Sequence, residues 1–138
     1  MSENKPLYLL DSFALVAYLG AENGKTRVQE LLSLAEKDHC RILMCLINLG
    51  EVLYISERER GLPAAQRVLA LVESLPIELF EASRDLVLDA AHIKALHALS
   101  YADAFAVAAA QREQAVILTA DPEFTSVEDL VKIEWLSK

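Results

Sequence analysis

Short apolar runs alternate with longer stretches of helical period along the whole chain, and this alternation restricts the fold more than any other feature. Five runs have the length of buried strands, at residues 7–10, 41–45, 77–80, 116–119 and 131–135. Helices are predicted between them, over residues 13–19, 27–37, 47–60, 63–74, 84–98 and 101–111, with Ser12, Thr26 and Ser83 as capping residues. The order predicts an α/β fold, a three-layer α/β/α sandwich around a mainly parallel sheet of about five strands.

The length and composition predict one domain over residues 1–138. The chain has 138 residues, 54% of them hydrophobic, and it contains neither an internal repeat nor a linker. No apolar run approaches the ~20 residues of a membrane span, and the first residues lack the features of a signal peptide, so a cytoplasmic location is expected. Cys40 and Cys45 are expected to be reduced thiols, and residues 121–129 are predicted to form a mobile loop.

Four acidic residues lie within apolar stretches or directly after them: Asp11, Glu51, Asp103 and Asp121. A lone buried carboxylate is costly, and no Lys or Arg lies within two positions of any of the four. This arrangement suggests a shared cation. Taken singly, Asp11 also fits a helix cap and Asp121 a turn before Pro122, and both structural interpretations stay open.

The predicted elements bring these acids towards one edge of the sheet. Asp11 and Asp121 follow the first and fourth strands, and ligands of open parallel sheets bind at the carboxyl ends of strands. Glu51 and Asp103 lie near the starts of helices, on largely apolar faces. Carboxylate oxygens suit Mg²⁺ or Mn²⁺. Such a site activates water and neutralises a phosphoryl transition state, which phosphodiester cleavage requires.

Four short motifs contain these acids and resemble one known family. They are Leu9-Leu10-Asp11-Ser12, Asn48-Leu49-Gly50-Glu51-Val52, residues 101–110 around Asp103, and Leu118-Thr119-Ala120-Asp121-Pro122-Glu123-Phe124. In this order and spacing the chain resembles the PIN-domain ribonucleases, and within them the VapC-like toxins of toxin–antitoxin pairs. The last apolar run also looks like the last strand of the family, so the likeness extends from Leu7 to Leu136.

The resemblance implies a metal-dependent endoribonuclease that acts on RNA. Asp11, Glu51, Asp103 and Asp121 would be the catalytic acids that hold Mg²⁺ or Mn²⁺, with Ser12 and Thr119 as hydrogen-bond donors behind them. A metal-activated water would attack the phosphate in line and leave a 5′-phosphate and a 3′-hydroxyl. The family further implies a small antitoxin protein that covers the site, and commonly a homodimer.

The net charge of −8 is unusual for a protein that binds RNA. The candidate phosphate contacts are Lys25, Arg41, Arg58, Arg60 and Lys94, which no pattern places together. Tyr54, Tyr101 and Phe124 fit either base stacking or core packing, and core packing is favoured for Tyr54. Trp135 is expected in the core or in a dimer contact. Two other functions remain open, a receiver-like signalling domain and a catalytically silent interaction module on the same kind of fold.

Overall fold

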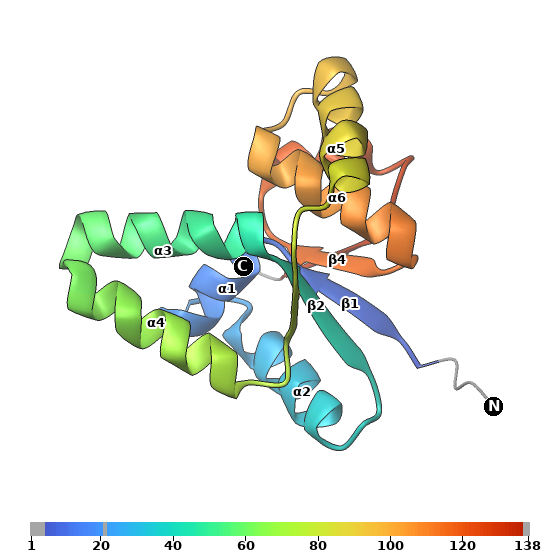
Figure 1. Ribbon diagram of the computed structural model, residues 1–138. Coiled ribbons are helices and arrows are strands. Elements are labelled where there is room, and N and C mark those ends of the chain that lie inside the picture. Colours follow the sequence, from blue (N-terminus) through green and yellow to red (C-terminus); the bar gives the residue numbers. More distant parts are fainter. Residues whose placement is uncertain (1–4, 21, 137–138) are drawn as a thin grey trace.

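A parallel sheet forms the centre of the computed structural model, which describes residues 5–20 and 22–136 (Figure 1). Its five strands lie in the order β3-β2-β1-β4-β5, and each pairs with its neighbours in parallel. The strands are β1 (Leu7–Leu10), β2 (Arg41–Cys45), β3 (Glu78–Phe80), β4 (Val116–Thr119) and β5 (Ile133–Trp135). The predicted parallel sheet is therefore confirmed, with strand ends that differ from prediction by at most two residues.

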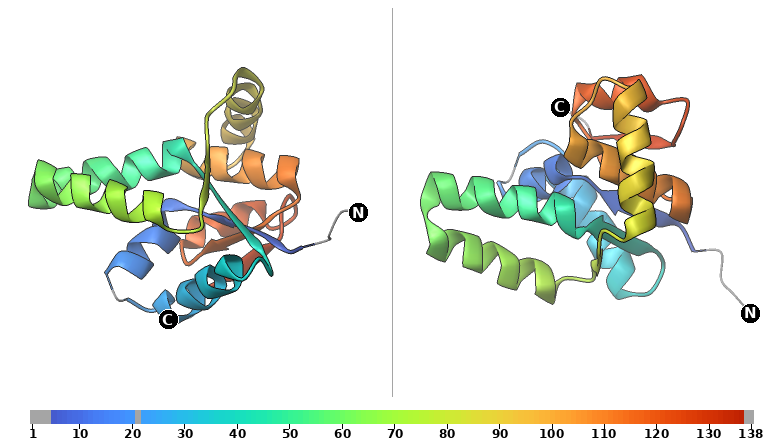
Figure 2. Two further views of the ribbon diagram at one scale, coloured as in Figure 1. Left: turned by 60° about the horizontal axis from the view of Figure 1, so that its bottom comes forward. Right: turned by 45° about the horizontal axis from the view of Figure 1, so that its top comes forward.

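Helices cover both faces of the sheet and enclose two separate apolar cores (Figures 1 and 2). One face carries α1 (Ser12–Leu19), α2 (Lys25–Glu36), α3 (Leu46–Arg60) and α4 (Leu62–Ser74), and the other carries α5 (Arg84–Leu96) and α6 (Tyr101–Glu113). The three-layer sandwich is confirmed. The α3–α4 hairpin turns at Gly61, whose φ of 92° suits glycine, and it extends beyond the sheet.

Two of the three predicted helix caps are wrong. Asp11, not Ser12, caps α1, because its Oδ1 accepts a hydrogen bond of 2.8 Å from the amide of Ala14, and Ser12 is the first residue of the helix. The helix α2 begins at Lys25, after Gly24 in a left-handed conformation, so Thr26 lies inside the first turn. Ser83 caps α5 as predicted.

The segment after β4, predicted to be a loop, is a 3₁₀ helix, η1 (Pro122–Val127). Asp121 caps it by accepting a hydrogen bond from the amide of Glu123, and Pro122 follows at a position that needs no amide donor. Phe124 and Val127 are buried in the core beneath α5 and α6. The stretch has too few residues for its helical period to be visible in the sequence.

Several side-chain predictions can be compared with the structure directly. Cys40 and Cys45 are buried free thiols, as expected. Phe124 belongs to the core, whereas Tyr54 is 50% exposed and Trp135 is 40% exposed, so the prediction of core packing was wrong for Tyr54. Over the described residues, no helix combines the length and the apolar character that a membrane crossing requires.

Candidate metal centre

The strands β1 and β4 lie side by side, and each is followed by a candidate acid. Leu10 pairs with Leu118, Asp11 directly follows β1, and Asp121 lies two residues beyond the end of β4. Both carboxylates are therefore at the carboxyl edge of the sheet, where open parallel sheets bind ligands. Asp11 is buried and Asp121 is half-buried.

The other two acids reach this edge from the starts of α3 and α6. Ser100 caps α6 by accepting a hydrogen bond from the amide of Asp103, which places that carboxylate in the first turn of the helix. Asn48 Nδ2 donates a hydrogen bond of 3.1 Å to the carbonyl of Ala102 and so joins α3 to the start of α6. Glu51 follows Asn48 by one helical turn, on the side of α3 that meets α1.

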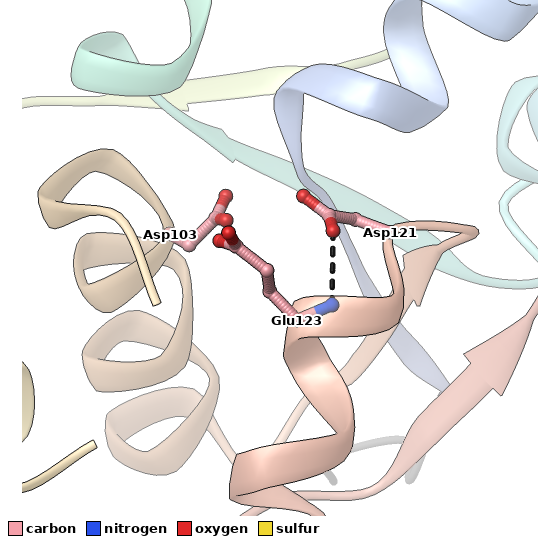
Figure 3. A group of neighbouring side chains, drawn as sticks. All are labelled: Asp103, Asp121 and Glu123. Atoms are coloured by element: carbon pink, nitrogen blue, oxygen red, sulfur yellow. Dashed lines mark hydrogen bonds between the residues drawn. The ribbon is translucent and has the colours of Figure 1, made fainter. Parts of the chain in front are cut away.

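A cluster of three carboxylates lies between α6 and η1 (Figure 3). One oxygen from each of Asp103, Asp121 and Glu123 lies within 4.8 Å of the others. Glu123 was not among the predicted site residues. The only sign of it in the sequence is its position two residues after Asp121. In the structure, its amide donates a hydrogen bond of 2.9 Å to Asp121 Oδ1.

Asp11 is held in a setting that disfavours its charge. Burial is the main reason that its pKa is raised to about 7, and the nearby charges of Asp103 and Asp121 raise the pKa further. The hydroxyl of Thr119 and the amide of Ala14 act in the opposite direction. Its second oxygen, Oδ2, is buried and has no hydrogen-bond partner.

Asp103 has a similarly raised pKa of about 7, again chiefly because the side chain is buried. The charges of Asp121, Glu51 and Glu123 add to this effect, while the hydroxyl of Ser100 lowers the pKa. Asp11 is thus close enough to Asp103 and Asp121 to be repelled by their charges, and Asp103 close enough to Asp121, Glu51 and Glu123. Their repulsion would become attraction around a shared cation.

Two hydroxyl groups contact these acids. Ser12 Oγ lies 2.6 Å from Glu51 Oε1 and 3.1 Å from the carbonyl oxygen of Asn48, and its single hydrogen can be donated to only one of them at a time. Thr119 Oγ1 accepts a hydrogen bond of 2.9 Å from the amide of Asp121. Both hydroxyls therefore lie directly beside acids of the candidate site.

The composition of the site fits a divalent cation. Its charged groups are all carboxylates, which Mg²⁺ and Mn²⁺ prefer as ligands. Among the described residues, the buried side-chain atoms without a hydrogen-bond partner are Asp11 Oδ2 and Asn48 Oδ1, both of them oxygen acceptors beside the site. An unpaired buried acceptor costs free energy that a bound cation or its water ligands would offset.

Three of the residues considered as phosphate contacts make other contacts in the structure. Arg41 begins β2 and therefore lies at the opposite end of the sheet, where it pairs with Glu78 at 2.7 Å. Lys25 donates a hydrogen bond to the carbonyl of Tyr18. Arg58 stacks over Tyr54 on α3, with 5.1 Å between the guanidinium carbon and the ring centre.

Comparison with known proteins identifies the family. The family model of the PIN domain matches residues 8–130, which include all four predicted acids and Glu123. The chain belongs to the PIN domain family. The receiver-like alternative is thereby excluded. No relative was found among curated protein sequences.

Several solved structures share the fold of the chain. The VapBC2 structure from Rickettsia felis, bound to a promoter DNA fragment, includes a chain with a TM-score of 0.76 and 18% identity, covering 95% of this chain and 99% of that one. The VapBC structure from Salmonella typhimurium, also bound to DNA, gives a TM-score of 0.71 at 19% identity. The match covers 94% of this chain and 98% of that one. VapC20 of Mycobacterium tuberculosis, a toxin that cleaves the sarcin–ricin loop, gives a TM-score of 0.69 at 18% identity. The match covers 87% of this chain and 94% of that one.

Proposed function

We propose that this PIN domain is a metal-dependent endoribonuclease and the toxin of a toxin–antitoxin pair. The observation that carries the proposal is the carboxylate cluster of Asp103, Asp121 and Glu123, joined by the buried Asp11, at the carboxyl edge of a PIN fold. Clustered carboxylates without a basic partner lower the stability of a fold. Binding of a catalytic cation would explain why a nuclease contains them.

The proposed cation is Mg²⁺ or Mn²⁺, held by Asp11, Asp103, Asp121 and Glu123, with Glu51 as a further ligand directly or through water. Bound there, it supplies charge neutralisation for the phosphoryl transition state and increases the acidity of a water. Ser12 orients the carboxylate of Glu51, and Thr119 holds the backbone amide of Asp121, through the contacts described above. The cap from Ser100 fixes the first turn of α6 and with it Asp103.

The proposed partners follow from the structural neighbours. The Rickettsia and Salmonella structures are VapBC structures, and VapC20 cleaves an RNA loop. By analogy, this chain acts as a single domain over residues 1–138, cuts RNA in the cytoplasm, forms a homodimer and is inhibited by a small antitoxin protein. The target RNA is left open, because these neighbours are under 20% identical to the chain.

Two experiments test the proposal. The purified chain is expected to cut single-stranded RNA when Mg²⁺ or Mn²⁺ is added, to leave 5′-phosphates, and to stop when EDTA is added. Expression of the chain alone is expected to arrest growth of a host cell, and Asp11→Asn is expected to relieve the arrest. Mn²⁺ binding without cleavage of any RNA offered would instead identify a silent interaction module.

A further inference from the structure

Trp135 is an exposed aromatic residue at the same edge of the sheet as the candidate metal centre. It ends β5 and pairs in register with Thr119 of β4, which lies two residues before Asp121. Its side chain is 40% exposed, although tryptophan is the largest apolar residue and usually finds cover in a core. Ile133 on the same strand packs against the core, so the position of β5 in the sheet does not by itself force its side chains into solvent.

A hollow beside the ring is lined by the residues that flank Asp121 in the chain. It measures about 370 Å³ and is lined by Ala120, Pro122, Thr125, Glu128, Trp135 and Leu136. Ala120 and Pro122 are the residues directly before and after Asp121, so the backbone that presents this acid to the cluster also forms a wall of the hollow. A ligand group in the hollow would therefore contact the residues on either side of Asp121.

The indole ring is held in place by its own polar atom. Trp135 Nε1 donates a hydrogen bond of 3.2 Å to Glu128 Oε2, which restrains the ring and uses its only donor. The part of the ring left for a partner is thus its apolar face. The second oxygen of Glu128 remains able to accept a hydrogen bond, for instance from an amino group on the edge of a base.

We propose that Trp135 stacks on a base of single-stranded RNA next to the phosphate that is cut, and so positions the substrate. This inference rests on the proposed nuclease function. Every base has a π-face, so stacking holds a strand without strict sequence preference and without attracting its phosphates. Such a contact suits a chain with a net charge of −8, in which electrostatic attraction of the RNA backbone is weak.

Fluorescence gives a direct test, because Trp135 is the only tryptophan of the chain. The Asp103→Asn protein is titrated with a single-stranded RNA hexamer of mixed sequence, and in parallel with a hexamer of the same backbone in which all bases are absent. Saturable quenching of the tryptophan emission by the first hexamer and none by the second is expected. Equal quenching by both would show a backbone contact and overturn the stacking proposal.

Kinetics of cleavage in Mn²⁺ supply a second, independent measurement. Trp135→Leu removes the stacking surface and is expected to raise KM about tenfold with kcat unchanged, whereas Trp135→Phe keeps a smaller ring and should show a smaller increase. Leu88→Ala, which shortens an exposed apolar side chain of α5, is the matched control and should leave KM unchanged. A KM unaffected by Trp135→Leu, in a protein whose melting temperature shows that it is folded, would contradict the proposal.

The outcomes separate this inference from the proposed function. RNA cleavage by the wild-type chain without quenching or a KM effect would refute the role of Trp135 and leave the nuclease intact. Absence of cleavage by the wild-type chain would refute the nuclease itself. Emission that responds to protein concentration but not to RNA, together with a dimer in sedimentation, would show that a second copy of the chain covers the ring, which also overturns the proposal.

Discussion

The carboxyl groups of Asp11 and Asp103 determine how the candidate site behaves before any cation arrives. Both are buried, and both have a pKa raised to about 7, so each holds a proton for part of the time near neutral pH. A cation that binds there must displace those protons, and acid therefore competes with metal at this site. Glu123, which is exposed, adds a ligand whose desolvation costs little.

Asp103→Asn is expected to abolish cleavage without unfolding the protein. The substitution removes one proposed cation ligand, and the cleavage rate should fall by at least about a hundredfold, as when other groups that stabilise transition-state charge are lost. In EDTA at pH 8 the free energy of unfolding should not decrease, because the repulsion with Asp121, Glu51 and Glu123 is relieved. RNA cleavage assays and urea unfolding measure the two effects, with the exposed Glu73→Gln as control. Wild-type cleavage by Asp103→Asn would remove this residue from the site.

Glu123→Gln tests the residue that sequence reasoning did not select. The dissociation constant for Mn²⁺ should rise about tenfold or more, the size of effect known for groups that support a metal site. The unfolding free energy of the metal-free protein should not decrease, since the side chain is exposed and its neutralisation relieves repulsion with Asp103. Calorimetric titration with Mn²⁺ measures the affinity. Asp129→Asn, an exposed acid just beyond η1, serves as control, and equal affinities in both variants would exclude Glu123 as a ligand.

At the scale of elements, strands could be predicted from apolar patterns in the sequence, whereas the polar contacts at helix starts could not. The strands were found because a strand buried on both faces is a continuous apolar run, and its neighbours in the sheet follow from the helices between them. Starts of helices were less predictable, because Asp11 and Ser12 are both good caps and only the fold decides which one accepts the amide of Ala14. Glu123 could not be predicted for the same reason, because its place in the cluster depends on the turn that Asp121 caps, and only the fold shows that turn.

The cap of α6 is expected to matter for the site as well as for the helix. Ser100→Ala removes the acceptor for the amide of Asp103 and should lower the free energy of unfolding by about 1 kcal/mol. It should also weaken Mn²⁺ binding, because the first turn that carries Asp103 is loosened. Ser83→Ala removes the equivalent cap of α5 and should cost similar stability with no change in Mn²⁺ affinity. The two variants, compared by urea unfolding and calorimetry, should differ only in metal binding.

At the scale of the whole molecule, folding without a cation favours the protonated form of Asp11 and Asp103, whereas cation binding needs the charged form. Without a cation, Asp11 and Asp103 have ordinary pKa values near 3.8 in the unfolded chain and about 7 in the folded chain. The folded state therefore binds more protons between these values, and folding stability must fall as pH rises across that interval. The loss is nearly complete about one pH unit above the folded-state pKa, which is near pH 8.

This pH dependence is a testable prediction. In EDTA, the free energy of unfolding attributable to the two acids should decrease by more than about 1 kcal/mol between pH 4.5 and pH 8. Subtracting the curve of the double variant Asp11→Asn, Asp103→Asn isolates their share from that of surface ion pairs such as Arg41–Glu78. Urea unfolding at a series of pH values provides the measurement. A difference curve that is flat over this range would mean that neither carboxyl is perturbed by folding.

Added Mn²⁺ should reverse the loss. At a concentration about a hundred times its dissociation constant, Mn²⁺ is expected to raise the free energy of unfolding by about 2.7 kcal/mol. Because protons compete for the ligands, the concentration required should be higher at pH 6 than at pH 8. Thermal melting with and without Mn²⁺ measures the shift, and an unchanged melting temperature at both pH values would argue against a shared cation site.

The pairing of β1 with β4 has a consequence for the time at which activity first appears. Within the domain, Asp11 leaves the ribosome before its neighbouring strand β4, and the Asp121 that follows β4 emerges later still. A nascent chain held on the ribosome before that point lacks the assembled carboxylate cluster. Under the proposed function, only chains in which Asp121 has emerged could cut RNA, and these are also the form that an inhibitor would have to meet.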